Sequence, residues 1–125
     1  MSFGESVRTV LSNYASFDGR AMRSEFWWFA LFYLLVQLAG GVLDAMLFPN
    51  SFGPIGALAS LALLLPYLAV AARRLHDIDR TGWWQLIGFV PVIGAVVLIV
   101  FFVQRGTPGP NRFGAPPADV AEVAA

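Results

Sequence analysis

The fold is decided by residues 26–48, which read FWWFALFYLLVQLAGGVLDAMLF. This run contains one charged residue, Asp44, and exceeds the roughly 20 apolar residues that a helix needs to cross a bilayer. Two more apolar runs follow at about 52–72 and 83–103. Soluble domains are about half apolar and a quarter charged, whereas this chain of 125 residues is 58% apolar and 13% charged. The sequence therefore predicts a membrane protein.

We predict an all-α integral membrane protein with three transmembrane helices, preceded by a short amphipathic interfacial helix and followed by a disordered C-terminal tail. The interfacial helix is expected at about 3–17, where apolar residues recur at helical spacing between polar ones. The membrane domain covers 1–114 and the tail covers 115–125. The first apolar run is too long and starts too late for a cleaved signal peptide, so we expect it to remain in the protein.

Two alternatives stay open for residues 83–103. A single crossing is favoured, because 21 residues of helix span about 31 Å whereas either half alone is too short. The tetrapeptide Pro91-Val92-Ile93-Gly94 could instead form the tip of a re-entrant pair of half-helices. In the second run, Pro66 is expected to kink the helix without breaking it, since neighbouring groups can satisfy the freed carbonyl.

The distribution of arginines predicts the orientation. With three crossings, the N-terminal segment and residues 73–82 share one side with six arginines, and the opposite side holds Arg105 and Arg112. An excess of basic residues marks the cytoplasmic side, so the N-terminus is expected in the cytoplasm of a multi-pass protein. A re-entrant third segment would bring all eight arginines to that side.

Charged residues and tryptophans gather at the cytoplasmic ends of the predicted helices. An ion-pair network that fixes the helix ends is favoured, because the acids nearly match the arginines. A site for anionic lipid headgroups is the alternative, because guanidinium groups suit phosphate and tryptophan favours the headgroup level. The residues of this arginine–tryptophan face are Arg20, Arg23, Glu25, Trp27, Trp28, Arg73, Arg74, His76, Asp77, Arg80, Trp83 and Trp84.

Small and polar residues recur within the apolar runs. Packing between helices is favoured, because small residues permit close approach and polar ones avoid lipid. Asp44 is also a candidate ion-coupling carboxylate, although it lies about one turn from the end of its run. The packing candidates are Gln37, Gly40, Gly41, Asp44, Gly56, Ser60 and Gly88.

The segment before the tail is rich in glycine and proline. It predicts either a backbone nest for an anion or a set of turns. The candidate residues are Gly106, Gly109, Asn111, Arg112 and Gly114.

Little in the composition favours catalysis. Cysteine is absent, which excludes thiolate nucleophiles and disulfides, and His76 is the single histidine. We expect no enzyme, no catalytic residue, no metal site and no cofactor. The net charge is zero, which gives no reason to expect nucleic-acid binding.

Three motifs in a fixed order resemble a known family. They read Phe17-Asp18-Gly19-Arg20-Ala21-Met22-Arg23-Ser24-Glu25-Phe26-Trp27-Trp28, then Arg73-Arg74-Leu75-His76-Asp77 continuing to Arg80-Thr81-Gly82-Trp83-Trp84, then Gly106-Thr107-Pro108-Gly109-Pro110-Asn111-Arg112-Phe113-Gly114. Separated by apolar runs over about residues 3–114, they resemble the bacterial inner-membrane family called domain of unknown function 805, the YhaH-like proteins. That pattern commonly has Gly at the position of Asp79 and Ser at that of Thr81. The resemblance implies the inner membrane and no established activity.

Three functions remain open. An accessory or scaffold subunit, associating with itself or a larger membrane complex, is favoured because the chain has almost no soluble mass. Binding or sensing of anionic lipid through the arginine–tryptophan face is the second. Transport of an ion or small solute by an oligomer is the third. The expected partners are membrane lipids, further copies of the chain or a larger membrane-protein complex.

Overall fold

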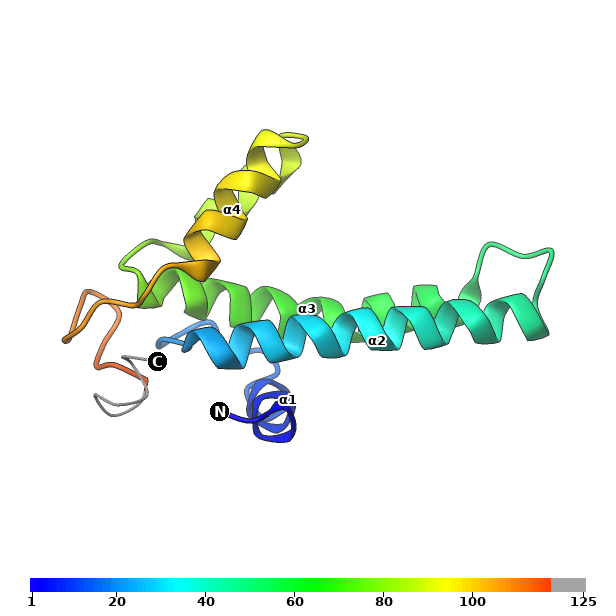
Figure 1. Cartoon of the computed structure of the whole chain (residues 1–125), viewed down its shortest axis with the longest axis horizontal. Coiled ribbons are helices and arrows are strands. Elements are labelled where there is room, and N and C mark those ends of the chain that lie inside the picture. The colour runs from blue at the N-terminus through cyan, green and yellow to red at the C-terminus, as the bar shows by residue number, and fades with distance from the viewer. Residues whose placement is uncertain (118–125) are drawn as a thin grey trace.

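A computed structural model describes residues 1–117 and shows an all-helical chain, with no strand longer than an isolated bridge in that range. The elements in order are α1 (Phe3–Ser12), α2 (Arg23–Leu47), α3 (Pro54–Asp77), the 3₁₀-helix η1 (Gly82–Phe89) and α4 (Ile93–Val103). Helices α2 and α3 form a long hairpin, α1 lies across it, and α4 leaves it at an angle (Figure 1). Most of the predicted disordered tail, residues 118–125, lies outside the described residues.

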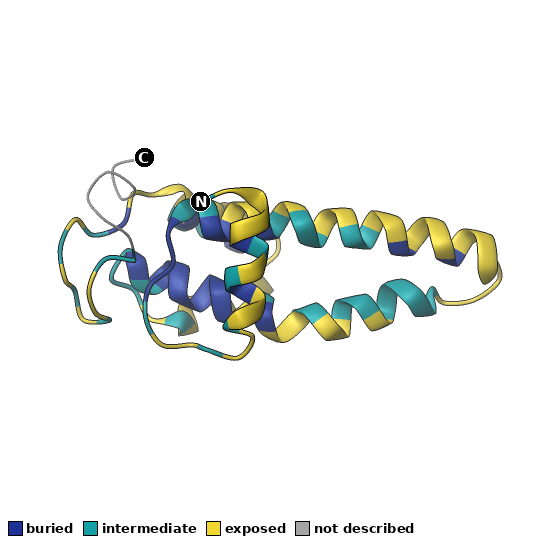
Figure 2. Ribbon diagram, turned by 90° about the horizontal axis from the view of Figure 1, so that it is seen from below, coloured by how far each residue is buried: buried dark blue, intermediate teal, exposed yellow. Residues whose placement is uncertain are grey.

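Helices α2 and α3 fall on the first two predicted spans. They contain 25 and 24 residues, so each is about 36 Å long or slightly more, enough to cross a bilayer. Only 11% of the most apolar stretch of α2 and 28% of that of α3 is buried within the chain. Figure 2 shows most of the buried residues gathered at one end of the hairpin and the rest of the hairpin largely exposed or half-buried. A core helix of a soluble protein would be mostly buried, so this surface requires apolar surroundings.

Helix α1 is shorter than the sequence predicts, because it ends at Ser12 rather than near residue 17. Ser2 caps its start: the Ser2 hydroxyl accepts a hydrogen bond from the Glu5 amide at 3.2 Å and donates one to the Glu5 carboxylate. Ser6 and Val10 are buried against the hairpin. α1 therefore crosses the hairpin where the exposed part of α2 and α3 begins.

Pro66 lies inside α3 without ending it. A proline cannot donate to the carbonyl four residues earlier, which here belongs to Ala62. The hydroxyl of Tyr14, in the segment after α1, donates a hydrogen bond to that carbonyl. The N-terminal segment thus satisfies the acceptor that Pro66 leaves open.

Residues 83–103 do not form the single helix that their length favoured. The chain runs through η1, reverses, and returns as α4. At the reversal Val92 has φ 65° and ψ −62°, and the Ile93 amide donates to the Pro91 carbonyl at 2.7 Å, which is a γ-turn. A Cβ on Gly94 would lie 1.8 Å from the Ile87 carbonyl oxygen, so only glycine lets the two arms meet. An apolar segment of this length is compatible both with one crossing and with two antiparallel half-helices, so its length alone does not give the path of the chain.

Both ends of this re-entrant hairpin, η1 with α4, lie at one end of α2 and α3. At its start, a Cβ on Gly82 would come within 2.9 Å of the Ala72 side chain. At its end, the Trp27 indole donates to the Phe102 carbonyl at 3.2 Å. The 11 residues of α4 span only about 16 Å, or half of a bilayer's hydrocarbon. The structure therefore has the backbone geometry of the re-entrant alternative, with residues 104–114 beside the N-terminal segment.

This arrangement predicts from which side of the membrane an introduced thiol can be labelled. The chain has no cysteine, so Ser12→Cys, Asn50→Cys and Ala115→Cys each introduce one thiol. We expect Ser12→Cys and Ala115→Cys to react with an impermeant maleimide from the same side of the membrane, and Asn50→Cys from the other, because α2 and α3 are long and apolar enough to cross and α4 runs back toward the start of η1. Labelling of Ala115→Cys from the side of Asn50→Cys would restore a third crossing.

Candidate functional site

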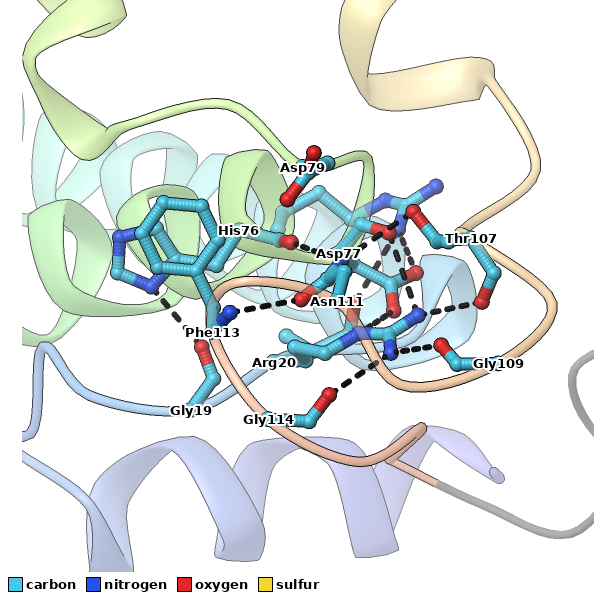
Figure 3. Close-up of polar contacts among 12 residues, drawn as sticks. Gly19, Arg20, His76, Asp77, Asp79, Thr107, Gly109, Asn111, Phe113 and Gly114 are labelled. Carbon is cyan, nitrogen blue, oxygen red and sulfur yellow. Dashed lines mark hydrogen bonds and ion pairs between the residues drawn. The ribbon is translucent and has the colours of Figure 1, made fainter.

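The three motifs of the sequence meet at the polar end of the hairpin. Their centre is the arginine–aspartate cluster, defined as Arg20, Arg74 and Asp77. Figure 3 shows Arg20 and Asp77 side by side. Asp77 lies in the last turn of α3, Arg74 one turn before it, and Arg20 in the segment between α1 and α2. The Arg20 Nε atom lies 2.9 Å from Asp77 Oδ1, and Arg74 Nη1 pairs with Asp77 Oδ2. All three residues are buried, so one carboxylate is shared by two buried cations.

The remaining donors of Arg20 bind backbone carbonyls. Nη1 donates to Gly109 at 2.7 Å and to Gly114 at 3.2 Å, while Nη2 donates to Thr107 at 2.6 Å and to Asp77 at 3.3 Å. Three of these acceptors belong to the glycine- and proline-rich segment (Figure 3). That segment therefore turns its carbonyl oxygens toward a cation.

The amide groups of the same segment bond inward. The donors with acceptors inside the chain are Thr107, Asn111, Arg112, Phe113 and Gly114. An anion nest needs several free amides aimed at one ion, so this geometry corresponds to the alternative of a set of turns. Gly106 allows the approach, because a Cβ there would lie 2.0 Å from Asp77 Oδ2.

Arg74 also completes the end of α4. Its Nε donates to the Phe102 carbonyl at 3.2 Å, Nη2 donates to Gln104, and Nη1 donates to Ala21 at 3.2 Å. The last carbonyls of a helix have no partner within it, and burying them bare is costly. Arg74 supplies those partners, so this one side chain joins α3, α4 and the start of α2.

A second buried ion pair lies beside the cluster. Arg73 Nη1 is 2.6 Å from Glu25 Oε2, and both side chains are nearly inaccessible. The pair links the first turn of α2 to the last turns of α3. The cluster and the pair of Arg73 with Glu25 are thus ion pairs within the chain rather than on its surface.

The rest of the arginine–tryptophan face is divided among other contacts. The Arg80 guanidinium lies 4.4 Å from the Phe101 ring centre and 5.2 Å from that of Trp84. Arg23 Nη1 donates to the Val103 carbonyl at 3.3 Å. The exposed tryptophans of this face are Trp27, Trp28, Trp83 and Trp84. Trp27 and Arg80 contact α4 of the re-entrant hairpin, whereas Trp28 packs edge-on against Phe3 of α1.

His76 fixes a turn. Its Nδ1 lies 2.9 Å from the Gly19 carbonyl oxygen, and its ring stacks on Phe113 with centres 4.0 Å apart. Nearby, Asp79 has φ 62°, a conformation that glycine adopts most easily. This explains why the family pattern commonly has Gly there, and Asp79 also pairs with Arg112 at 3.2 Å. The sequence did not single out Gly19 or Phe113, although both lie in the motifs.

Asp44 caps a helix from the far end of the hairpin. Its carboxylate oxygens accept hydrogen bonds from the amides of Ile55 at 2.8 Å and Gly56 at 2.9 Å, in the first turn of α3. Gly40 approaches Gly56 closely, since a Cβ on Gly40 would lie 3.3 Å from the Gly56 Cα. Gln37 Nε2 is buried nearby with no hydrogen-bond partner among the described residues.

The other packing candidates lie apart from Asp44. Gly88 packs against Leu98 inside the re-entrant hairpin, Ser60 is half-buried on α3, and Gly41 faces open space. The predicted stripe of small and polar residues is therefore divided between two interfaces and an outer surface of α2.

The charged groups of this region bind one another and nearby backbone carbonyls. Arg20 and Arg74 together bind Asp77 and the carbonyls of three separate segments, which leaves their donors committed. Within residues 1–117, no group of three or more His, Cys, Asp or Glu side chains is placed to hold a metal ion. The cluster joins segments distant in sequence rather than presenting reactive groups.

Comparisons with known proteins identify relatives over nearly the whole chain. The model of the family described as "Protein of unknown function (DUF805)" matches residues 14–115. Inner membrane protein YhaH of Escherichia coli K12 is 46% identical over 111 residues, covering 86% of this chain and 92% of its own. Inner membrane protein YhaI of the same strain is 47% identical over 109 residues, covering 87% and 92%. The uncharacterized protein YiiR is 30% identical, covering 84% and 88%. No solved structure matches.

The shared carboxylate should be essential for stability. Asp77→Asn leaves two buried guanidinium groups without their counter-charge, so we expect a loss of about 3–5 kcal/mol in the free energy of unfolding. Asp79→Asn is the matched control, because its pair with Arg112 is exposed and should contribute less than about 1 kcal/mol. Unfolding in mixed detergent micelles, followed by circular dichroism, measures both. Equal losses would show that the cluster does not hold the fold.

The cap at Asp44 predicts a graded effect. Asp44→Ala removes both acceptors from the first turn of α3 and should cost about 1–2 kcal/mol of unfolding free energy. Asp44→Asn keeps one acceptor and should cost less. The same micelle titration checks the order. Full stability of Asp44→Ala would mean that the carboxylate does not act as a cap.

Proposed function

The chain belongs to the DUF805 family of proteins of unknown function, and from that membership we propose that it is a small accessory or scaffold protein of the bacterial inner membrane. It associates through the α2–α3 hairpin with a second copy or with a larger membrane complex. The relatives named as inner membrane proteins support the location. The N-terminus and residues 104–114 face the cytoplasm, because that end of the hairpin holds the excess of arginines.

The observation that carries this proposal is the bare surface of the hairpin beyond α1. Few residues of the apolar stretches of α2 and α3 are buried within the chain. On α2, Gly41 and Ala45 are exposed one turn apart, and a Cβ on Gly41 would meet nothing within 4 Å. Small residues spaced by four let a neighbouring helix approach closely in a membrane. This surface suits a helix of another subunit.

The charged groups give further support, because most of them already have partners inside the chain. The guanidinium groups of Arg20 and Arg74 and the carboxylates of Asp44 and Asp77 bind partners inside the chain. A transport role is less supported, because Asp44 already accepts two amide hydrogen bonds. The surface available for contact with other molecules is mainly the exposed apolar sides of α2 and α3.

Binding of anionic lipid is the second candidate function, and the structure favours other arginines for it than Arg73 and Arg74. Arg73 and Arg74 are buried, so they support the fold rather than a headgroup site. Arg105 is exposed, and Arg80 stacks on Trp84 and Phe101 at the root of the re-entrant hairpin. These two arginines lie where anionic headgroups would be expected.

Extraction of the intact protein tests the proposal. The tagged chain is taken from its native membrane into polymer discs, and its mass and its protein and lipid companions are determined by mass spectrometry. We expect a complex larger than a monomer that Gly41→Leu disrupts, because the added side chain fills the notch on α2. Val42→Leu, on an exposed neighbouring position, should leave the complex intact.

Two outcomes would contradict the proposal. A lone monomer without companions would exclude a scaffold role. A monomer enriched in anionic lipid, with the enrichment lost in Arg80→Gln with Arg105→Gln, would favour the lipid-binding candidate instead.

A further inference from the structure

A cavity of about 410 Å³ opens between α3, η1 and the segment after α1. Leu68 and Ala72 line it from α3, Trp83 and Leu86 line it from η1, and His76 closes it near the arginine–aspartate cluster. Its volume falls in the range of about 300–1,000 Å³ typical of small-molecule sites. The lining is almost wholly apolar, as such sites are, with very few polar groups to orient a ligand.

The His76 ring presents one acceptor to this cavity. Nδ1 faces the Gly19 carbonyl at 2.9 Å, and a carbonyl only accepts, so Nδ1 carries the hydrogen. In the neutral ring Nε2 is then an acceptor. Nε2 lies on the cavity side, 3.8 Å from the place that a Cβ on Gly82 would occupy. Among residues 1–117 it has no hydrogen-bond partner, and stacking on Phe113 together with the Gly19 contact holds the ring in place.

The surroundings limit the chemistry of an occupant. No other ionisable side chain lines the cavity, and Gln85 donates its amide to the Leu68 carbonyl at 3.2 Å. Trp83 and Leu86 are exposed on the side of the bundle, so the cavity is open toward the membrane. An apolar body would replace lipid contact there, and a hydroxyl would donate a hydrogen bond to the fixed acceptor.

We propose that this cavity binds a membrane-soluble molecule with an apolar body and a single hydroxyl group, which donates a hydrogen bond to His76 Nε2. The hydroxyl can belong to a lipid alcohol or to a phenol. The binding is independent of the oligomeric state and of any partner protein.

Photolabelling of the full chain in phosphatidylcholine discs tests the site. The probe is 1-hexadecanol carrying a diazirine, and the control is its methyl ether, which cannot donate. We expect the alcohol to label peptides containing Leu68 or Leu86 about three- to tenfold more than the ether, as one hydrogen bond implies. Equal labelling by both probes would reduce the cavity to ordinary lipid contact and overturn the proposal.

Two matched variants separate the site from the surface. Leu68→Trp fills the cavity and should abolish the selective labelling, whereas Leu64→Trp, one turn away on α3 and exposed, should retain it. Dioleoylglycerol and 4-dodecylphenol, added in turn as competitors, then distinguish a lipid alcohol from a phenol. Failure of both to compete, or retained labelling in Leu68→Trp, would contradict the proposal, because a hydroxyl-selective site must exchange its occupant.

Discussion

The fold depends on the neutralisation of two buried guanidinium groups by one carboxylate. Asp77 accepts from Arg20 and Arg74, and each arginine then uses its remaining donors on backbone carbonyls. A charge removed from water is tolerated only when it is paired and hydrogen-bonded. The need to satisfy these groups brings together the segment before α2, the end of α3, the end of α4 and residues 106–114. The polar end of the molecule is therefore ordered by electrostatics, and its apolar end by contact between two helices.

Much of this architecture could be predicted from the sequence, because hydropathy and helical spacing are local properties. The positions of α2 and α3, the start of α1 and the polar segment after α3 follow from such patterns, whereas the end of α1 does not. The path of residues 83–103 could not be predicted from them. Apolar length is the same for one crossing and for two half-helices, and the deciding features are a γ-turn at Val92 and the close approach at Gly94.

The candidate site was predictable only in composition. The sequence identified the arginines and acids as a network, but pairing between Arg20 and Asp77 joins residues that are 57 positions apart. No local pattern specifies such a pair. The same holds for Tyr14. Its hydroxyl donates to the carbonyl of Ala62, which Pro66 leaves free, and the two residues are 48 positions apart. The three motifs are far apart in the sequence. In the structure their residues contact one another at the polar end of the hairpin.

The contact between Arg20 and Gly114 has a consequence for biosynthesis. The two residues are separated by 94 positions. During translation, Arg20 reaches the membrane surface long before its last carbonyl acceptors exist. The hydrogen bonds of Arg20 to residues 107–114 can form only after that segment has been synthesised, so this part of the fold forms late. A chain that stops before residue 107 would leave the Arg20 guanidinium without three of its carbonyl acceptors.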